Sequence, residues 1–348
     1  MAGRRGSPAG GRLLLKDPVR LDATPTTPGI PDMVSLLASD PAVSIVVPLY
    51  GKADVIGQTV EAVLRQTFAA FELIVVDDGS QDGGGEVVAA FTDPRIRLIR
   101  QANAGSAAAR NRGVAAARAD WIAFLDADDL WAGRHLENLL AAASKGDAVA
   151  VFANHLLASR AAPVMKADIP DQRVDDVFAF LLATYPYAVH SSSVLVARSA
   201  LIRAGLFPVG AVMGEDTDTW CRLAFEGPFR YVAEPTAVYR DGHPTSVLAH
   251  QSRRRPLPPP FDRTLTARLR HGTVPPHLVR SAGRYRNFLM LEYARQLLDI
   301  GEADAARDIL RRHCRLADDP MRYARRFLRT WGFGHRLYAL SRPWVPTR

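Results

Sequence analysis

Apolar and polar positions follow two alternating patterns along the chain. Short runs rich in β-branched residues, bounded by proline, glycine or aspartate, are typical of buried strands. They occur at Val43–Tyr50, Phe71–Val76, Ile96–Ile99 and Trp121–Leu125. Between these runs, apolar residues recur every three or four positions, which is the spacing of an amphipathic helix. The alternation predicts an α/β fold with a doubly wound, mostly parallel sheet.

The second half of the chain is less regular but contains further runs of the same kinds. Strands are predicted at Ala148–Phe152, Ser193–Ala197, Phe229–Val232 and Ala237–Arg240. Near the C-terminus, Tyr285–Ile300 and Ala303–His313 have helical spacing and are separated by Gly301, which predicts a helical hairpin. The fold is therefore expected to end in an α-helical extension.

Changes in composition divide the chain into four segments. Residues 1–40 are rich in Gly, Pro, Arg, Ser and Thr and are predicted to be disordered. The α/β domain is expected at residues 41–250, and residues 251–262 form a stiff linker rich in proline and arginine. A basic helical region is expected at residues 263–348.

Composition and charge narrow the class of protein. The 348 residues are 48% hydrophobic and 23% charged, so the chain can bury a core. Its two cysteines, Cys221 and Cys314, lie far apart, which argues against a disulfide framework and favours a cytoplasmic location. Residues 251–348 carry 21 Lys+Arg against 8 Asp+Glu. Within them, the segment Met321–Trp331 mixes arginine with aromatic residues. Two interpretations of this segment stay open: contact with an anionic membrane surface, or packing on its own domain.

The strongest chemical signal is an acidic cluster, Asp126-Ala-Asp128-Asp129, directly after the strand Trp121–Leu125. At the carboxyl edge of an open α/β sheet, such side chains face the crevice where ligands bind. Close carboxylates repel one another, and an Mg²⁺ or Mn²⁺ ion with oxygen ligands relieves that repulsion. The alternative is an acidic surface turn, because aspartate is common where chains reverse. The cluster by itself does not decide between the two.

Four other polar stretches stand at predicted strand ends or turns: Pro48-Leu-Tyr50, Asp77-Asp78-Gly79-Ser80, Asn103–Gly113 and Glu215-Asp216. With the acidic cluster, and in this order, they resemble the motifs of the bacterial inverting glycosyltransferases of family 2. The resemblance covers roughly residues 42–246. It implies the GT-A fold, a Rossmann-like domain that binds a nucleotide sugar.

The resemblance implies nucleotide-sugar binding by residues at several strand ends. Pro48 and Tyr50 correspond to a segment that lines the base pocket, although Gly51 replaces the family's usual polar residue. Asp78 corresponds to a carboxylate that accepts a hydrogen bond from uracil. The remaining residues are Gly105, which lets the backbone approach the nucleotide, and Arg110 and Asn111, which supply donors or hold the acidic loop.

The resemblance also implies roles for the acids and for one histidine. Asp128 is the firmest metal ligand, Asp126 lies near the ribose or a metal-bound water, and Asp129 supports them. His243 is a further candidate for the metal or the diphosphate, although a histidine in a loop is more often only solvated.

The stretch Glu215-Asp216 opens a predicted helix. Acids in a first turn are stabilised by the helix dipole whatever their function. The resemblance implies that Asp216 is the catalytic base that takes the proton of the acceptor hydroxyl, and that Glu215 orients the base or the sugar. His190, with the serines that follow it, is placed on the acceptor side by position alone.

The sequence thus predicts a metal-dependent inverting glycosyltransferase that uses a nucleotide sugar, in particular a UDP-sugar, in cell-surface glycan or polysaccharide biosynthesis. The acceptor would be a glycan, a lipid-linked sugar or another hydroxyl compound, reached from the cytoplasm or the inner face of the plasma membrane. The alternatives are a degenerate nucleotide-sugar-binding scaffold and a nucleic-acid-binding protein that uses the basic tail. No recognised nucleic-acid motif accompanies that charge. A dehydrogenase is disfavoured because no Gly-x-Gly-x-x-Gly follows a strand.

Overall fold

The computed structural model describes residues 40–331 apart from residues 161, 167, 185–186 and 242–254. The predicted disordered segment, up to residue 39, and His243 lie outside the described residues. The described residues all belong to one compact unit. In the part that is described, no helix is both long and apolar enough to cross a bilayer.

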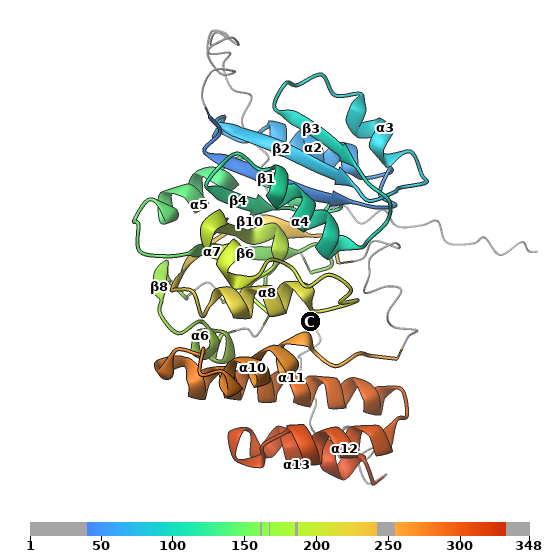
Figure 1. The fold of residues 1–348 in the computed structure, drawn as a ribbon, viewed down its shortest axis with the longest axis vertical. Helices are drawn as coiled ribbons and strands as arrows, with labels where there is room; N and C mark the ends of the chain where they lie inside the picture. Colours follow the sequence, from blue (N-terminus) through green and yellow to red (C-terminus); the bar gives the residue numbers. More distant parts are fainter. Residues whose placement is uncertain (1–39, 161, 167, 185–186, 242–254, 332–348) are drawn as a thin grey trace, which may run out of the picture. The chain divides into compact units, whose positions relative to one another are not determined.

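Four parallel strands form one half of the central sheet, in the order β3-β2-β1-β4 (Figure 1). They are β1 (Val43–Leu49), β2 (Phe71–Asp77), β3 (Ile96–Arg100) and β4 (Trp121–Phe124). Both β1 and β2 are almost wholly buried, which explains their β-branched sequences. The predicted strands and the parallel order of a doubly wound sheet are confirmed.

The other half of the sheet is mixed. It continues from β4 in the order β9-β6-β10-β5, where β9 is antiparallel to β4 and to β6, while β6 and β10 are parallel. Short β7 and β8 pair with β6 and β10. Their bounds are β5 (Leu130–Trp131), β6 (Ala150–Leu157), β7 (Ala162–Pro163), β8 (Gln172–Val174), β9 (Val194–Ala197) and β10 (Phe229–Tyr239).

Helices cover both faces of the sheet, and each face has its own core. Side chains alternate along the strands, so Val46 of β1 belongs to one core and its neighbours Ile45 and Val47 to the other. Helix α4 approaches β1 closely at Gly113, where a Cβ atom would lie 2.3 Å from Val46 Cγ1. The helices of this domain are α2 (Ile56–Leu64), α3 (Gly84–Ala89), α4 (Ser106–Ala116), α5 (His135–Ala143), α6 (Val177–Ala183), α7 (Arg198–Ala204) and α8 (Glu215–Leu223).

The strand register brings the predicted site stretches to one edge of the sheet. Leu49 of β1 pairs with Asp77 of β2, and Val46 pairs with Phe124 of β4. The segments that follow these three parallel strands therefore leave the sheet at the same end. This end is the one at which open α/β sheets bind their ligands.

The C-terminal helical extension is confirmed, and its first part shares the core of the α/β domain. It consists of α10 (Pro260–Arg270), α11 (Val279–Asp299), α12 (Ala303–His313) and α13 (Pro320–Arg329). Phe261 of α10 stacks on Phe178 of α6, with ring centroids 5.7 Å apart, and Tyr285 of α11 joins the same cluster. Helix α10 begins at Pro260, inside the range predicted as a linker.

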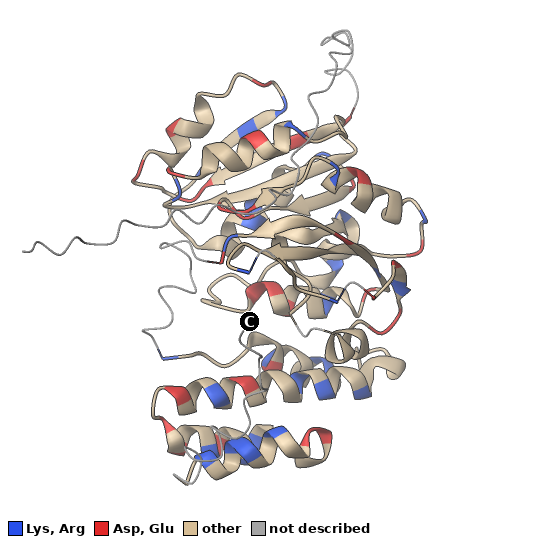
Figure 2. Cartoon of the chain, turned by 180° about the vertical axis from the view of Figure 1, so that it is seen from behind, with Lys and Arg blue, Asp and Glu red and all other residues tan. Residues whose placement is uncertain are grey.

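The hairpin α11–α12 turns at Gly301, whose φ of +84° favours glycine, and α13 packs back on it. Arg326 of α13 is buried and donates to Glu292 of α11, and Arg329 donates to Asp299 over 2.8 Å. Figure 2 shows both signs of charge on these helices. One face of α13 is therefore used for packing within the chain.

Candidate functional site

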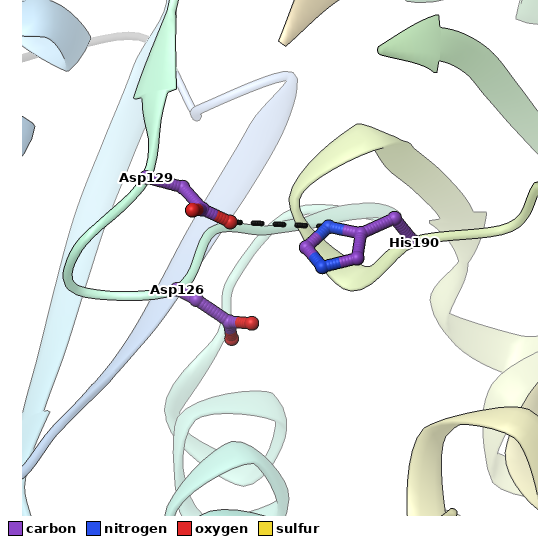
Figure 3. Close-up of side chains that lie close together, drawn as sticks. All are labelled: Asp126, Asp129 and His190. Carbon is purple, nitrogen blue, oxygen red and sulfur yellow. Dashed lines mark ion pairs between the residues drawn. The ribbon is translucent and has the colours of Figure 1, made fainter. Parts of the chain in front are cut away.

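The acidic loop after β4 has a histidine next to it. One ligand atom each from Asp126, Asp129 and His190 lies within 4.8 Å of the others (Figure 3). His190 Nδ1 is 3.8 Å from Asp129 Oδ2, and His190 immediately precedes the short helix η1 (Ser191–Ser193). The predicted acidic cluster is thus joined by a residue that the sequence placed on the acceptor side only.

Asp129 is wholly buried and holds the loop in place. Its carboxylate accepts hydrogen bonds from Ser192 Oγ at 2.5 Å and from the backbone N–H of Arg240 at 2.9 Å. Thr59 Oγ1 donates to the carbonyls of Ala127 and Asp129. Burial, followed by the charge of Asp126, raises the pKa of Asp129 well above its usual range. These contacts fix the shape of the loop, and support of a metal ligand by Asp129 stays a prediction.

Asp126 and Asp128 remain partly accessible, with side-chain exposures of 27% and 13%. Burial raises the pKa of Asp126, but the charges of Arg110 and of nearby His190 and Lys52 outweigh it, so the pKa stays below its usual range. Asp128 Oδ2 lies 2.5 Å from Lys52 Nζ. Lys52 comes from the segment after β1, at the same edge of the sheet, and sequence reasoning gave it no role.

Arg110 links the acidic loop to the start of α8. The guanidinium, only 6% exposed, donates to Asp126 over 2.7 Å and to Glu215 over 3.0 Å. Ser106, at the start of the same helix α4, also donates to Glu215, over 2.9 Å. Burial lowers the pKa of Arg110, but the two carboxylates raise it more, so the side chain stays charged. The Arg110 side chain therefore connects two motifs, one 16 residues and the other 105 residues further along the chain.

Asp78 is buried and shapes the loop before α4. Its carboxylate accepts hydrogen bonds from the backbone N–H groups of Ala104 and Gly105, at 2.9 and 2.8 Å, and from Gln101 Nε2. Gly105 has φ +90°, which only glycine adopts readily, and no atom lies within 4 Å of a Cβ placed there. Contact of Asp78 and Gly105 with a nucleotide stays a prediction. The hydrogen bonds show a further role of Asp78, which is to fix the shape of this loop.

The other residues predicted to contact the nucleotide differ in their surroundings. Tyr50 is 55% exposed at the end of β1, and Pro48 is half-buried within the strand. Asn111 makes a two-way pairing with the backbone of Phe207: its Nδ2 donates to the carbonyl and its Oδ1 accepts from the N–H. Asn111 thus holds the segment before α8, and its contact with a nucleotide remains a prediction.

Asp216 lies in the first turn of α8 and lines a cavity of about 110 Å³. Its Oδ1 accepts a hydrogen bond from the backbone N–H of Thr217 at 2.6 Å. Burial, partly offset by the charge of Arg110, raises the pKa of Asp216. Burial and the charge of Asp216 also raise the pKa of Glu215. Raised carboxyl pKa values in a cavity are typical of groups that accept and release protons.

The sheet and the position of its acidic loop define a GT-A fold, and solved structures agree. The chain covers 93% of the chain of a structure of residues 1–349 of Staphylococcus aureus TarS in complex with UDP-GlcNAc, with a TM-score of 0.64 and 14% identity over 87% of this chain. The mannosyltransferase PcManGT from Pyrobaculum calidifontis, in complex with GDP-Man and Mn²⁺, matches 87% of this chain and 86% of its own with a TM-score of 0.56 and 22% identity. At these identities the likeness establishes the fold.

Sequence comparisons match part of the chain to a family. Residues 44–168 match the model of glycosyl transferase family 2, so the resemblance is confirmed for this part of the chain. Glycosyltransferase GlyG of Streptococcus pneumoniae is 38% identical over 116 residues, 32% of this chain and 38% of GlyG. The UDP-Glc:alpha-D-GlcNAc-diphosphoundecaprenol beta-1,3-glucosyltransferase WfgD of Escherichia coli is 38% identical over 117 residues, 33% of this chain and 46% of WfgD. The matched segments span less than half the length of these relatives.

Proposed function

We propose that the protein is an inverting glycosyltransferase that moves a sugar from a nucleotide sugar to an acceptor hydroxyl. The observation that carries the proposal is the buried Arg110, which ties Asp126 of the acidic loop to Glu215, the neighbour of Asp216. A donor site and a base must face one another across the sugar that is transferred. The family match and the names of the relatives support the same reaction.

On the donor side, the chain offers groups of both charges. The loop held by Asp78 presents exposed backbone at Gly105, where a nucleotide has room to approach. Lys52, next to Asp128, supplies a positive charge for a diphosphate. The names of one relative and two structural neighbours mention UDP or GDP sugars, and for this chain we propose a UDP-sugar as the donor.

A divalent cation, Mg²⁺ or Mn²⁺, fits the chemistry of this site. Asp126 and Asp128 are partly accessible carboxylates, and an imidazole nitrogen of His190 lies within 4.8 Å of carboxylate oxygens of Asp126 and Asp129, so hard oxygen ligands and one imidazole are available at this loop. Asp129 is less suitable, because both its oxygens already accept hydrogen bonds. When bound, the ion would neutralise the charge that develops on the leaving diphosphate.

On the acceptor side, Asp216 acts as the general base. Its carboxylate takes the proton of the acceptor hydroxyl as that oxygen bonds to the anomeric carbon, while the bond from this carbon to the diphosphate oxygen breaks. Attack from the face opposite the leaving group inverts the anomeric centre, and no covalent sugar–enzyme intermediate is required. Glu215, held by Arg110 and Ser106, positions the turn that carries the base.

The rate of transfer is expected to depend on pH through Asp216. Burial raises the pKa of this carboxyl, and only the ionised form accepts a proton, so the rate falls as the pH drops through the raised value. The acid limb will therefore lie at higher pH than an ordinary aspartate would give. Initial rates at saturating donor, measured across pH, test this. An identical acid limb in the residual activity of Asp216→Asn would contradict the assignment.

Replacement of Asp128 should affect binding of the donor and not the catalytic base. In Asp128→Ala, the affinity for nucleotide sugar in the presence of Mn²⁺ should fall at least about tenfold, because an oxygen ligand is lost. Calorimetry with and without EDTA measures the metal-dependent part. Asp120→Ala is the matched control, since this exposed aspartate precedes the same strand β4. Unchanged Mn²⁺ dependence in Asp128→Ala would remove Asp128 from the metal site.

The names of the relatives support a proposal for the cellular role. We propose an acceptor that is a glycan or a lipid-linked sugar in surface glycan biosynthesis, and a cytoplasmic site of action at the inner face of the plasma membrane. Met321 and Leu328 of α13 and the nearby Trp331 are exposed apolar side chains among arginines, which supports contact with an anionic surface.

The membrane contact can be tested on vesicles. Met321→Ser with Leu328→Ser should weaken sedimentation with phosphatidylglycerol vesicles several-fold, because apolar area and charge act together at such surfaces. Phosphatidylcholine vesicles provide the neutral control. Equal binding of the parent protein to both kinds of vesicle, or to neither, would contradict the proposal.

A further inference from the structure

Each aspartate of the acidic loop has a partner that the protein itself supplies. Arg110 donates to Asp126 over 2.7 Å, and Lys52 Nζ lies 2.5 Å from Asp128 Oδ2. Both carboxylate oxygens of Asp129 accept hydrogen bonds. The chain's own cations therefore reduce the repulsion among the three carboxylates, and the loop does not depend on a metal ion to keep its shape.

The two cations differ in how firmly their charge is held. The planar guanidinium of Arg110 donates to Asp126 and Glu215 at once, so its orientation is fixed by two carboxylates. The ammonium of Lys52 is a point charge at the end of a flexible four-carbon stem, with three donors that rotate freely. Lys52 is therefore the cation that can turn from one neighbouring anion to another.

The backbone around Lys52 and Asp128 is anchored to one helix, α2. The carbonyl of Lys52 accepts hydrogen bonds from two N–H groups at the start of α2, at 3.1 and 2.9 Å. Thr59 of the same helix donates to the carbonyls of the residues on either side of Asp128. Contact between the two side chains can therefore be made or broken by rotation of the lysine, without movement of either backbone.

The ammonium of Lys52 and a divalent cation compete for the carboxylate of Asp128. With Nζ 2.5 Å from one oxygen, a metal ion on either oxygen would lie within roughly 5 Å of the ammonium, where like charges repel. The side chains of Lys52 and Asp128 are only 10% and 13% exposed, so solvent screens this repulsion poorly. A diphosphate removes the conflict, because its oxygens accept hydrogen bonds from an ammonium and also bind metal ions.

We propose that Lys52 is a positioning residue that makes metal binding depend on the nucleotide diphosphate. Without nucleotide, its ammonium holds Asp128 and disfavours a second cation there. With the diphosphate present, the ammonium turns to a phosphate oxygen and leaves the Asp128 carboxylate to the metal ion. The inference rests on the proposed function, since it takes Asp128 as a metal ligand and a nucleotide sugar as the donor. Coupling is reciprocal, so the metal ion strengthens nucleotide binding by the same factor.

The first test measures the affinity of the full chain for Mn²⁺ from the electron paramagnetic resonance signal of the free ion. Titrations are made without nucleotide, with excess uridine and with excess UDP, and the last is corrected for Mn²⁺ bound to UDP in solution. UDP should raise the affinity for Mn²⁺ at least about tenfold, whereas uridine, which lacks phosphates, should leave it unchanged. Equal affinity with and without UDP would overturn the inference, and the proposed function would stand if UDP still binds.

Replacement of Lys52 gives the second test. Lys52→Met removes the charge and nearly keeps the length of the side chain, so the affinity for Mn²⁺ without nucleotide should rise about three- to tenfold. Lys52→Arg keeps the charge and should keep the low affinity of the parent protein. The matched control is Lys145→Met, at an exposed position after α5, which should bind Mn²⁺ as the parent does.

A rise in metal affinity separates the proposed role from a structural one, because damage to the loop would lower it. Unchanged or weaker Mn²⁺ binding by folded Lys52→Met would overturn the inference. The titrations of the parent protein decide the question if this variant does not fold. Failure of the parent to bind UDP even with Mn²⁺ would overturn both the inference and the proposed function.

Discussion

Asp216→Asn should lower the rate of sugar transfer about 10²- to 10⁴-fold, the range that a general base contributes. Asparagine has nearly the same shape, and its amide oxygen can still accept the N–H of Thr217, so the first turn of α8 should persist. The amide cannot accept a proton from the acceptor hydroxyl, and only the chemical step is lost. Steady-state rates at saturating donor and acceptor measure the effect.

Donor binding provides the internal control for this substitution. Calorimetric affinity for the nucleotide sugar should change less than about twofold, because the donor groups lie on the other side of Arg110. Asp120→Asn, at an exposed position before β4, should transfer at the parental rate. A normal transfer rate in Asp216→Asn would show that another group accepts the proton.

Arg110→Gln should destabilise the protein by about 3–5 kcal/mol, as expected when one partner of a buried ion pair is removed. Asp126 and Glu215 would each lose a charged partner, and both are largely enclosed. Glutamine cannot replace Arg110, because its neutral side chain does not balance the charges of the two carboxylates. The free energy of unfolding from urea titration measures the loss, and transfer should fall with it because both sides of the site move.

The matched control is Arg112→Gln, two positions further along α4. Arg112 is exposed, and no ion pair is found for it among the described residues, so its replacement should change stability by less than about 0.5 kcal/mol. Equal stability of the two variants would show that Arg110 is not the link between the acidic loop and α8.

Most of the α/β domain could be predicted from local pattern, because buried parallel strands have a characteristic β-branched sequence. The predictions for β1 to β4 differ from the structure by one residue each, at the C-terminal end of the strand. The two strands predicted on either side of Pro235 are one strand, β10, whose pairing with β6 shifts between Val232 and Ala237. Proline occurs within strands at such irregularities. In the sequence, Pro235 looked like the end of one strand and the start of another, so two strands were predicted.

The start of the C-terminal extension shows a different limit. The run of prolines before Phe261 indicated a linker, yet Pro260 begins α10, and proline is favoured in the first turn of a helix. What decides the outcome is the burial of Phe261 against Phe178 and Tyr285, residues distant in the chain. The short strands β5, β7 and β8 were also missed, because pairing with distant partners defines them.

For the site, the sequence located the acids but not their partners. Carboxylates that follow strand ends must meet at one edge of the sheet, which made Asp78 and the acidic loop predictable. The contacts of Lys52 with Asp128 and of His190 with Asp129 depend on how loops fold back, and no spacing indicates them. A basic residue directly after β1, at the same edge as the acids, was the available signal for Lys52.

The most direct test of the central claim is a calorimetric titration of UDP, GDP and TDP into the full chain, each with Mn²⁺ and with EDTA. One nucleotide should bind tightly with Mn²⁺, lose most of its affinity in EDTA, and bind weakly to Asp128→Ala even with the metal. That result would name the donor class and confirm the acidic loop as its site. Absence of binding by all three nucleotides with Mn²⁺ would contradict the assignment of a nucleotide-sugar site.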